Sequence, residues 1–184
     1  MQPGQSIVVP GQILYLSDTT VNLAYQRVRY LDVALRYSIK TTDWGRFTAD
    51  SSLTYTREYT FTKTPGGVLT NYVDRDGYPR YRVQSHIGWK FRSYEAGLIN
   101  NFMPSYGKVA IDGYRTAQYS TFNAFVSHQF SSKSLLLAGT RLSLGMDNLL
   151  DQDPPLYYNA VGYDQSYVGR PQGRFGYVTL KKEF

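Results

Sequence analysis

The sequence has 184 residues, a formal net charge of +6, no cysteine and 42% hydrophobic residues, and its aromatic content of 16% includes 18 Tyr. The lack of cysteine excludes disulfides, thiolate metal sites and cysteine nucleophiles, and Lys and Arg are scattered singly without forming the basic stripe of a nucleic-acid-binding protein. No run approaches the ~20 consecutive apolar residues of a transmembrane helix, but β-strands that turn every second side chain toward lipid keep the mean hydropathy as low as it is here.

The first residues predict little regular structure. The segment MQPGQSIVVPGQ lacks a basic region followed by an apolar core, so we expect no signal peptide within residues 1–184. Two short apolar runs, 7–9 and 13–16, lie on either side of Pro10 and Gly11, and we interpret them as a short hairpin.

Two long strands are predicted next, because residues two apart on a strand share a face. The apolar face of the first strand carries Leu31, Val33, Leu35, Tyr37 and Ile39. Its polar face carries Asp32, Ala34, Arg36, Ser38 and Lys40. After a polar turn at 41–45, the apolar face of the second strand is expected to carry Phe47, Ala49, Leu53, Tyr55, Tyr59 and Phe61. The opposite face is expected to carry Arg46, Thr48, Asp50, Thr54 and Glu58.

Five more alternating segments follow, at 80–92, 94–106, 121–130, 138–150 and 177–184. Together with the first two they give about seven long strands. No segment shows a helical periodicity, so we expect no helix.

The connections between these strands alternate in length. Short links fall near residues 42, 92 and 132, and long links rich in Gly, Tyr and polar residues fall at about 64–78, 107–118 and 151–173. Bacterial outer-membrane barrels have short periplasmic turns and longer extracellular loops, so this order favours such a barrel. Aromatic residues are expected near strand ends on the apolar face, where rings rest at lipid headgroups: Tyr37, Tyr59, Phe61, Trp89, Phe91, Tyr94, Tyr106 and Phe130.

The C-terminal third of the chain, from Arg141 to Phe184, contains Asn148, Leu149, Leu150 and Asp151 within the segment GMDNLLDQDPP. With this motif, that part of the chain resembles the TonB-dependent receptors of Gram-negative bacteria. That family commonly shows Asn-Leu-aromatic-Asp followed by prolines where the penultimate strand enters the last extracellular loop. Leu150 stands where the family usually has an aromatic residue.

Other segments extend the resemblance. Tyr163-Asp164, Gly169-Arg170-Pro171 and Gly173-Arg174 are similar to the family's final loop and its return. The terminal Phe184 resembles the C-terminal aromatic residue that the barrel-assembly machinery recognises, although Lys182 stands where that signal often has another aromatic. The segment QRVRYLDVALRYSIKTTDWGRF is similar to a strand, turn and strand unit of the late barrel.

The resemblance implies that residues 1–184 are the C-terminal segment of a receptor β-barrel, without a plug domain. The expected fold is all-β, an antiparallel up-and-down meander of about seven long transmembrane strands plus a short N-terminal hairpin, part of a larger outer-membrane β-barrel. The implied function is energised uptake of a scarce solute such as a ferric siderophore, cobalamin or oligosaccharide across the cell outer membrane of a Gram-negative bacterium.

The resemblance also implies partners. These are outer-membrane lipid and lipopolysaccharide, the barrel-assembly machinery through the C-terminal strand, and an extracellular small-molecule ligand. TonB is expected to act only through a plug domain that residues 1–184 do not contain. Nucleic acid is not expected as a partner.

No motif in the sequence predicts an enzyme. His86 and His128 fall on different predicted strands without an obvious partner, and the sequence contains no GxGxxG, GxxxxGK or GxSxG motif. Asp147, Asp151 and Asp153 lack EF-hand spacing, which favours loop solvation and turn capping over calcium binding. We therefore expect no catalytic residue, no cofactor and no metal.

Basic residues on the predicted lumen face are candidate solute contacts: Arg36, Arg80, Arg82, Lys90 and Arg141. Basic side chains along a polar cleft attract anionic solutes. Pairing with inward carboxylates such as Asp32, Asp50 or Glu95 is the favoured alternative. The Tyr-rich loops at 72–81, 114–119 and 157–167 are candidates for stacking on a sugar or an aromatic ligand.

Two other classes of protein remain alternatives. A small self-contained eight-stranded outer-membrane barrel with a structural or adhesion role requires residues 1–20 to supply one more strand. A soluble lipocalin-like binder requires the charged side chains of 80–92 to pack inside.

Overall fold

The computed structural model describes residues 15, 25–62, 64–75, 77–130, 138–156 and 173–183. Within these ranges the chain forms one antiparallel sheet of eight strands in the order β1-β2-β4-β5-β6-β7-β8, with β3 paired to β2. The strands are β1 (Gln26–Thr41), β2 (Gly45–Phe61), β3 (Thr70–Asn71), β4 (Tyr81–Phe91), β5 (Tyr94–Met103), β6 (Tyr119–Gln129), β7 (Thr140–Asp147) and β8 (Phe175–Lys182). The predicted all-β antiparallel meander is confirmed.

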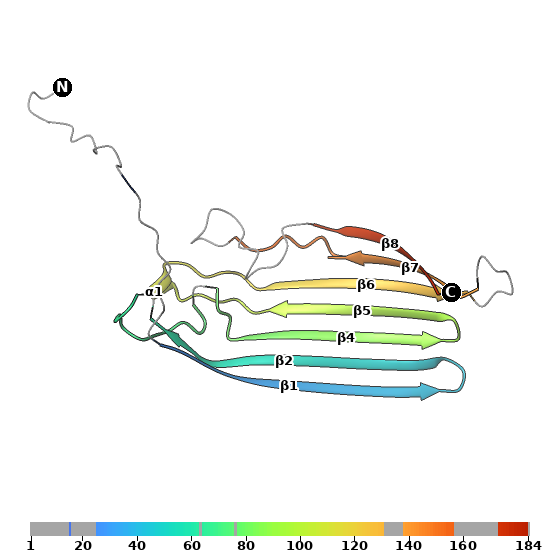
Figure 1. The fold of residues 1–184 in the computed structure, drawn as a ribbon, viewed down its shortest axis with the longest axis horizontal. Coiled ribbons are helices and arrows are strands. Elements are labelled where there is room, and N and C mark those ends of the chain that lie inside the picture. Colours follow the sequence, from blue (N-terminus) through green and yellow to red (C-terminus); the bar gives the residue numbers. More distant parts are fainter. Residues whose placement is uncertain are drawn as a thin grey trace, which may run out of the picture.

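Short turns and long loops lie at opposite ends of the sheet (Figure 1). The β1–β2 and β4–β5 turns define one end, which we call the turn end, and the β2–β4 and β5–β6 connections define the other, which we call the loop end. One helical turn, α1 (Val109–Asp112), lies at the loop end and ends at Gly113, whose φ is 77°. The prediction of no helix is wrong at this single turn.

The two tight turns follow from local chemistry. Thr41 pairs with Gly45 across a three-residue loop, and Gly45 adopts a φ of 84°, which three-residue hairpins require at this position. The Thr41 hydroxyl accepts a hydrogen bond from the Trp44 backbone N–H at 3.1 Å and donates one to the Gly45 carbonyl at 2.9 Å. The β4–β5 turn has only two residues, and Arg92 adopts a φ of 52° there.

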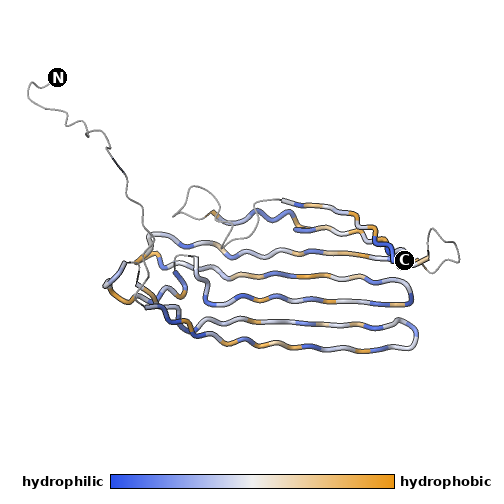
Figure 2. The backbone as a smooth tube through the Cα atoms, viewed as in Figure 1, coloured by the Kyte–Doolittle hydropathy of each residue, from blue (hydrophilic) through white to orange (hydrophobic). Residues whose placement is uncertain are grey.

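The sheet has an apolar and a polar face, as hydropathy alternating along the strands indicates (Figure 2). Cross-strand partners share a face, so the register groups the residues of the apolar face across all the long strands. It includes Leu31, Val33, Leu35, Tyr37, Ile39, Phe47, Leu53, Tyr55, Val83, Ile87, Trp89, Tyr94, Leu98, Phe102, Phe122, Val126, Leu142, Leu144, Met146, Val178 and Leu180.

In the described residues nothing covers the apolar face. Leu35 is 70% exposed and Leu180 is 69% exposed, although they lie on opposite flanks of the sheet. The buried hydrophobic residues of the described chain are Tyr72, Val73, Met103 and Tyr106. All of them lie at the loop end, so the described residues form no hydrophobic core beneath the sheet.

A β-bulge in β2 changes which residues lie on which face. Arg29 pairs with Glu58 and Tyr30 pairs with Thr56, so Arg57 is the extra residue. Beyond the bulge, Tyr59 is opposite Val28. Val28 and Arg36 are separated by an even number of residues on β1, so both lie on the polar face, and Tyr59 lies there with them. The prediction that Tyr59 and Phe61 lie on the apolar face is therefore wrong, as is the placement of Glu58 on the polar face.

Other differences from the predicted strands concern their ends. β1 begins at Gln26, where the predicted strand, turn and strand unit begins, and so includes residues before the alternation that starts at Leu31. β5 ends at Met103 because Pro104 has no N–H to continue the ladder, so Tyr106 lies in the following loop, where it is fully buried and not at a strand end on the apolar face. β7 ends at Asp147.

The sheet is open in this structure, with β1 and β8 as its edges. Closure into a small eight-stranded barrel, which the alternative requires, is therefore not seen within the described residues. The predicted N-terminal hairpin at 7–9 and 13–16, the short link near 132 and the terminal Phe184 lie outside the described residues.

Candidate functional site

The polar face of the sheet brings together most of the candidate solute contacts. The register places Arg36, Arg82, Lys90 and Arg141 on this face, on strands β1, β4 and β7. Arg80 lies just before β4, where its carbonyl accepts a hydrogen bond from the Thr56 N–H at 2.8 Å. Four of the five predicted residues therefore share one surface.

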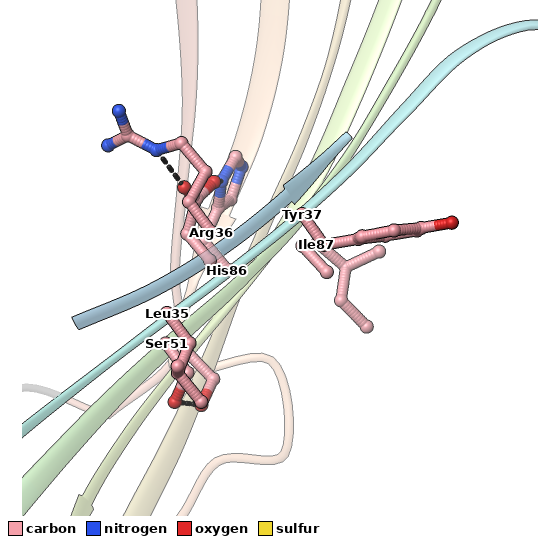
Figure 3. A pocket seen from close by; sticks show the side chains of 9 residues that line it. Leu35, Arg36, Tyr37, Ser51, His86 and Ile87 are labelled. Carbon is pink, nitrogen blue, oxygen red and sulfur yellow. Dashed lines mark hydrogen bonds and ion pairs between the residues drawn. The ribbon is translucent and has the colours of Figure 1, made fainter. Parts of the chain in front are cut away.

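The carboxylate of Asp50, on β2, pairs with Arg36. Arg36 Nε donates to Asp50 Oδ1 at 2.5 Å, and His86 Nδ1 lies 3.4 Å from Asp50 Oδ2. Figure 3 shows Arg36 and His86 on one side of the strands, with Tyr37 and Ile87 on the other. His86, which the sequence left without an obvious partner, thus lies beside a carboxylate in the same cross-strand row.

A second ion pair holds Arg141. Its NH1 group lies 3.1 Å from Glu95 Oε2, and its Nε donates to Gln129 Oε1 at 3.1 Å. Arg36 and Arg141 are therefore paired with carboxylates of the same face, as the interpretation favoured over solute contact had it.

Three cations remain adjacent to one another near the turn end. Lys40 is directly opposite Arg46, and Arg46 is directly opposite Lys90. Like charges in directly opposite positions destabilise a sheet. Within the described part of the chain no ion pair forms to Lys40, Arg46 or Lys90, so this region attracts anions. Arg82 also forms none there, but it lies at the opposite end of β4, toward the loop end.

Glycines on the polar face make room for aromatic rings of neighbouring strands. Phe125 lies so close to Gly97 that a Cβ at residue 97 would overlap its ring, and Tyr177 covers Gly145 in the same way. Gly97 and Gly145 are both cross-strand partners of Phe125. On the β5–β8 side of the polar face these rings therefore lie beside the Arg141–Glu95 ion pair.

The predicted Tyr-rich loop after β2 forms an aromatic cluster with the end of that strand. Tyr59 stacks on Tyr78 with ring centroids 4.4 Å apart, and Phe61 stacks on Tyr72 at 4.2 Å. Gln26 Nε2 donates to the Tyr59 hydroxyl at 3.1 Å. These rings contact each other, so loop packing is the role that the structure gives to Tyr72 and Tyr78.

The second Tyr-rich loop also packs on itself. Met103 and Tyr106 form a buried cluster with Tyr114 and Tyr119 around it, and Tyr106 exchanges two backbone hydrogen bonds with Thr116, at 3.1 and 2.7 Å. A hydrogen bond of 3.1 Å from the Gly107 N–H to the Asp74 carbonyl joins this loop to the one after β2. The third Tyr-rich loop, 157–167, lies outside the described residues.

The residues that carry the family resemblance form a structural turn. Asn148 adopts a φ of 50°, its side-chain oxygen accepts from the Gln152 N–H at 2.9 Å, and its Nδ2 donates to the Gln152 carbonyl at 2.9 Å. Asp151 Oδ1 accepts from the Arg174 N–H at 2.7 Å, just before β8. Leu149 and Leu150 are exposed, so the two polar residues of the motif hold the turn.

The same turn also reaches β6. The Asn148 N–H donates to Asn123 Oδ1 at 3.0 Å, and the Leu149 N–H donates to the Phe122 carbonyl at 2.7 Å. The turn therefore ties together the ends of β6, β7 and β8. Sequence reasoning did not single out Asn123, and its place on a strand that alternates regularly gave no signal of this contact.

The described residues offer no group of three or more His, Asp or Glu side chains placed to hold a metal ion. Among the aspartates considered for calcium, Asp151 is used in the turn before β8. His128 lies on the apolar face between the rings of Tyr94 and Phe130, with centroid distances of 4.5 and 4.7 Å.

Comparison with known proteins found no matching family model, no similar curated protein and no similar solved structure. None of the helical residues described here forms a helix long and apolar enough to cross a membrane.

Proposed function

We propose that this chain is part of the wall of an outer-membrane β-barrel transporter of the TonB-dependent receptor type, with its apolar face toward lipid and its polar face toward the lumen. The observation that carries this proposal is the uncovered apolar face opposite a charged one. A soluble chain of this size buries roughly two thirds of its surface. Here Leu35 and Leu180, on opposite flanks of the sheet, remain exposed, and lipid is the solvent that stabilises such a face.

Aromatic residues bound the apolar face at both ends. Phe47, Trp89 and Tyr94 lie toward the turn end, and Tyr55, Tyr81 and Phe102 lie toward the loop end. Phe47 and Tyr55 are eight residues apart, about 27 Å along the strand and about 20 Å along the membrane normal at the usual strand tilt. The apolar band of outer-membrane barrels is ≈ 25 Å tall and is flanked by aromatic girdles, so the spacing supports the proposal.

The polar face favours an anionic solute. Its cations are Arg36, Lys40, Arg46, Arg82, Lys90, Arg141 and Lys181. Its carboxylates are fewer, namely Asp32, Asp50, Glu95 and Asp147, together with Glu183 just after β8, which pairs with Lys181 at 3.2 Å. A ferric siderophore is the solute class that this excess of positive charge supports best among those the resemblance implies, with the protein acting as a carrier and not as an enzyme.

The two open edges support a larger barrel. An unpaired strand edge exposes N–H and C=O groups that lipid does not satisfy. In the proposed barrel, further strands between β1 and β8 pair with these two edges.

The proposal is tested by placing one arginine on either face of the same strand. Leu35→Arg puts the charge on the apolar face, and the matched control Ala34→Arg puts it on the polar face one residue away. We expect Leu35→Arg to lower barrel stability by roughly 2–4 kcal/mol and to reduce the folded protein in the outer membrane, while Ala34→Arg assembles normally. The measurement is the protease-protected protein in outer-membrane fractions of a Gram-negative host that expresses the gene encoding this chain.

The opposite pair of outcomes would contradict the proposal. Equal tolerance of both arginines would mean that neither face meets lipid. Leu144→Arg repeats the test on β7 and is expected to behave like Leu35→Arg.

A further inference from the structure

The outward face of the sheet changes character at the bulge in β2. On the turn-end side of the bulge it carries Leu31, Val33 and Leu35, and on the loop-end side the same face of β1 carries Arg27 and Arg29. Arg29 lies two residues, or about 7 Å, beyond Leu31. The cationic pair therefore begins where the apolar band ends.

Glu58 holds the two arginines side by side. Its Oε1 lies 3.8 Å from Arg27 NH1, and its Oε2 lies 3.3 Å from Arg29 Nε. The side chain of Glu58 is 22% exposed, whereas those of Arg27 and Arg29 are 47% and 57% exposed. One carboxylate thus lies behind two exposed guanidinium groups, each of which has further N–H donors.

The local charge is positive. Arg57, the extra residue of the bulge, is exposed and forms no ion pair in the described part of the chain. Arg27 and Arg29 thus share the single carboxylate of Glu58, and Arg57 adds a third positive charge next to it in the sequence. An anion can therefore bind without displacing Glu58.

We infer that Arg27 and Arg29, held by Glu58, form a binding site for the phosphate groups of a lipopolysaccharide headgroup at the outer edge of the apolar band. This inference rests on the proposed function, because it requires the apolar face to lie in lipid with the loop end outward. Guanidinium groups bind phosphate through paired N–H donors, and headgroup phosphates lie at the level where the apolar side chains end. The continuity of the Arg pair with the apolar face favours a lipid phosphate over one free in solution.

The inference is tested by removing the charges on one face and then on the other. The test variant is Arg27→Gln/Arg29→Gln, and the control is Arg82→Gln/Lys90→Gln, which removes the same charge from the polar face. The protein is expressed from its own gene, purified in detergent and titrated with diphosphoryl lipid A in mixed micelles. We expect the test variant to bind lipid A at least about tenfold more weakly and the control to bind like the unaltered protein.

Further measurements distinguish a lipid phosphate from a free one and test whether Arg27 and Arg29 bind it. Unaltered protein should lose its affinity for lipid A from which both phosphates have been removed, and millimolar inorganic phosphate should not compete. Equal weakening in both double variants, undiminished binding in the test variant, or competition by free phosphate would each overturn the inference. Circular dichroism checks that the test variant keeps its β-structure, and if it does not, the milder Arg29→Lys, which keeps the charge but loses the fork of donors, is expected to weaken binding in its place.

Failure of this inference is distinct from failure of the proposed function. If Leu35→Arg and Ala34→Arg assemble equally well, the membrane placement itself fails. If they differ but lipid A binding is independent of Arg27 and Arg29, only the phosphate site fails.

Discussion

At the scale of single residues, Asn148 is the clearest case of a side chain that replaces backbone hydrogen bonds. It tolerates a φ of 50° and bonds to both the N–H and the carbonyl of Gln152, as Asn does in turns. We expect Asn148→Ala to lower the free energy of unfolding by about 1–3 kcal/mol, because it removes these bonds and places a β-carbon in the left-handed region. The measurement is the urea midpoint of unfolding in detergent micelles. Asn148→Gly loses the side-chain hydrogen bonds but adopts the positive φ without strain, so its midpoint should fall between those of the unaltered protein and Asn148→Ala. An unchanged midpoint for Asn148→Ala would contradict this role.

At the scale of elements, the bulge in β2 decides which side of the sheet the loop-end aromatic cluster occupies. Deleting Arg57 leaves Glu58 opposite Arg29 and Tyr59 opposite Val28 in a regular ladder, so the cluster should persist. Deleting Thr60 moves Phe61 to the opposite face from Tyr59 and removes its stack on Tyr72, at a cost of about 0.5–1.5 kcal/mol or more. We expect the near-ultraviolet circular dichroism of the Arg57 deletion to resemble that of the unaltered protein and that of the Thr60 deletion to lose intensity. If the Arg57 deletion lost the signal and the Thr60 deletion kept it, the bulge would not decide the face on which the aromatic cluster lies.

At the scale of the whole molecule, the uncovered face and open edges make the chain dependent on an apolar solvent. Val178 and Leu180 on β8 and Leu31 and Leu35 on β1 are more than half exposed, and long unpaired edges promote association of sheets. We expect the full chain to aggregate when it is diluted from denaturant into water and to recover β-structure when it is diluted into detergent micelles. Light scattering and far-ultraviolet circular dichroism measure the two outcomes. A monodisperse folded monomer in water would favour the soluble lipocalin-like alternative.

Much of the fold was predictable because strand side chains alternate with a period of two. That period is visible in the sequence wherever one face is apolar, so it correctly gave the faces of β1, the antiparallel order and the tight turns at Gly45 and Arg92. The same pattern predicted the shared face of Arg36, Arg82, Lys90 and Arg141. These features depend on neighbouring residues alone, and local sequence therefore determines them.

Contacts between strands were decided only by the tertiary structure. Period-two alternation does not show which residue a ladder leaves unpaired, so Arg57 and the exchange of faces at Tyr59 and Phe61 could not be predicted. Register also fixed which charges meet: it placed Asp50 between Arg36 and His86 and left Lys40, Arg46 and Lys90 adjacent. The sequence by itself determined the alternation, the turns and the excess of positive charge on one face. The pairing of backbone hydrogen bonds across strands decided the partners, because a shift of one residue in that pairing moves every following side chain to the other face.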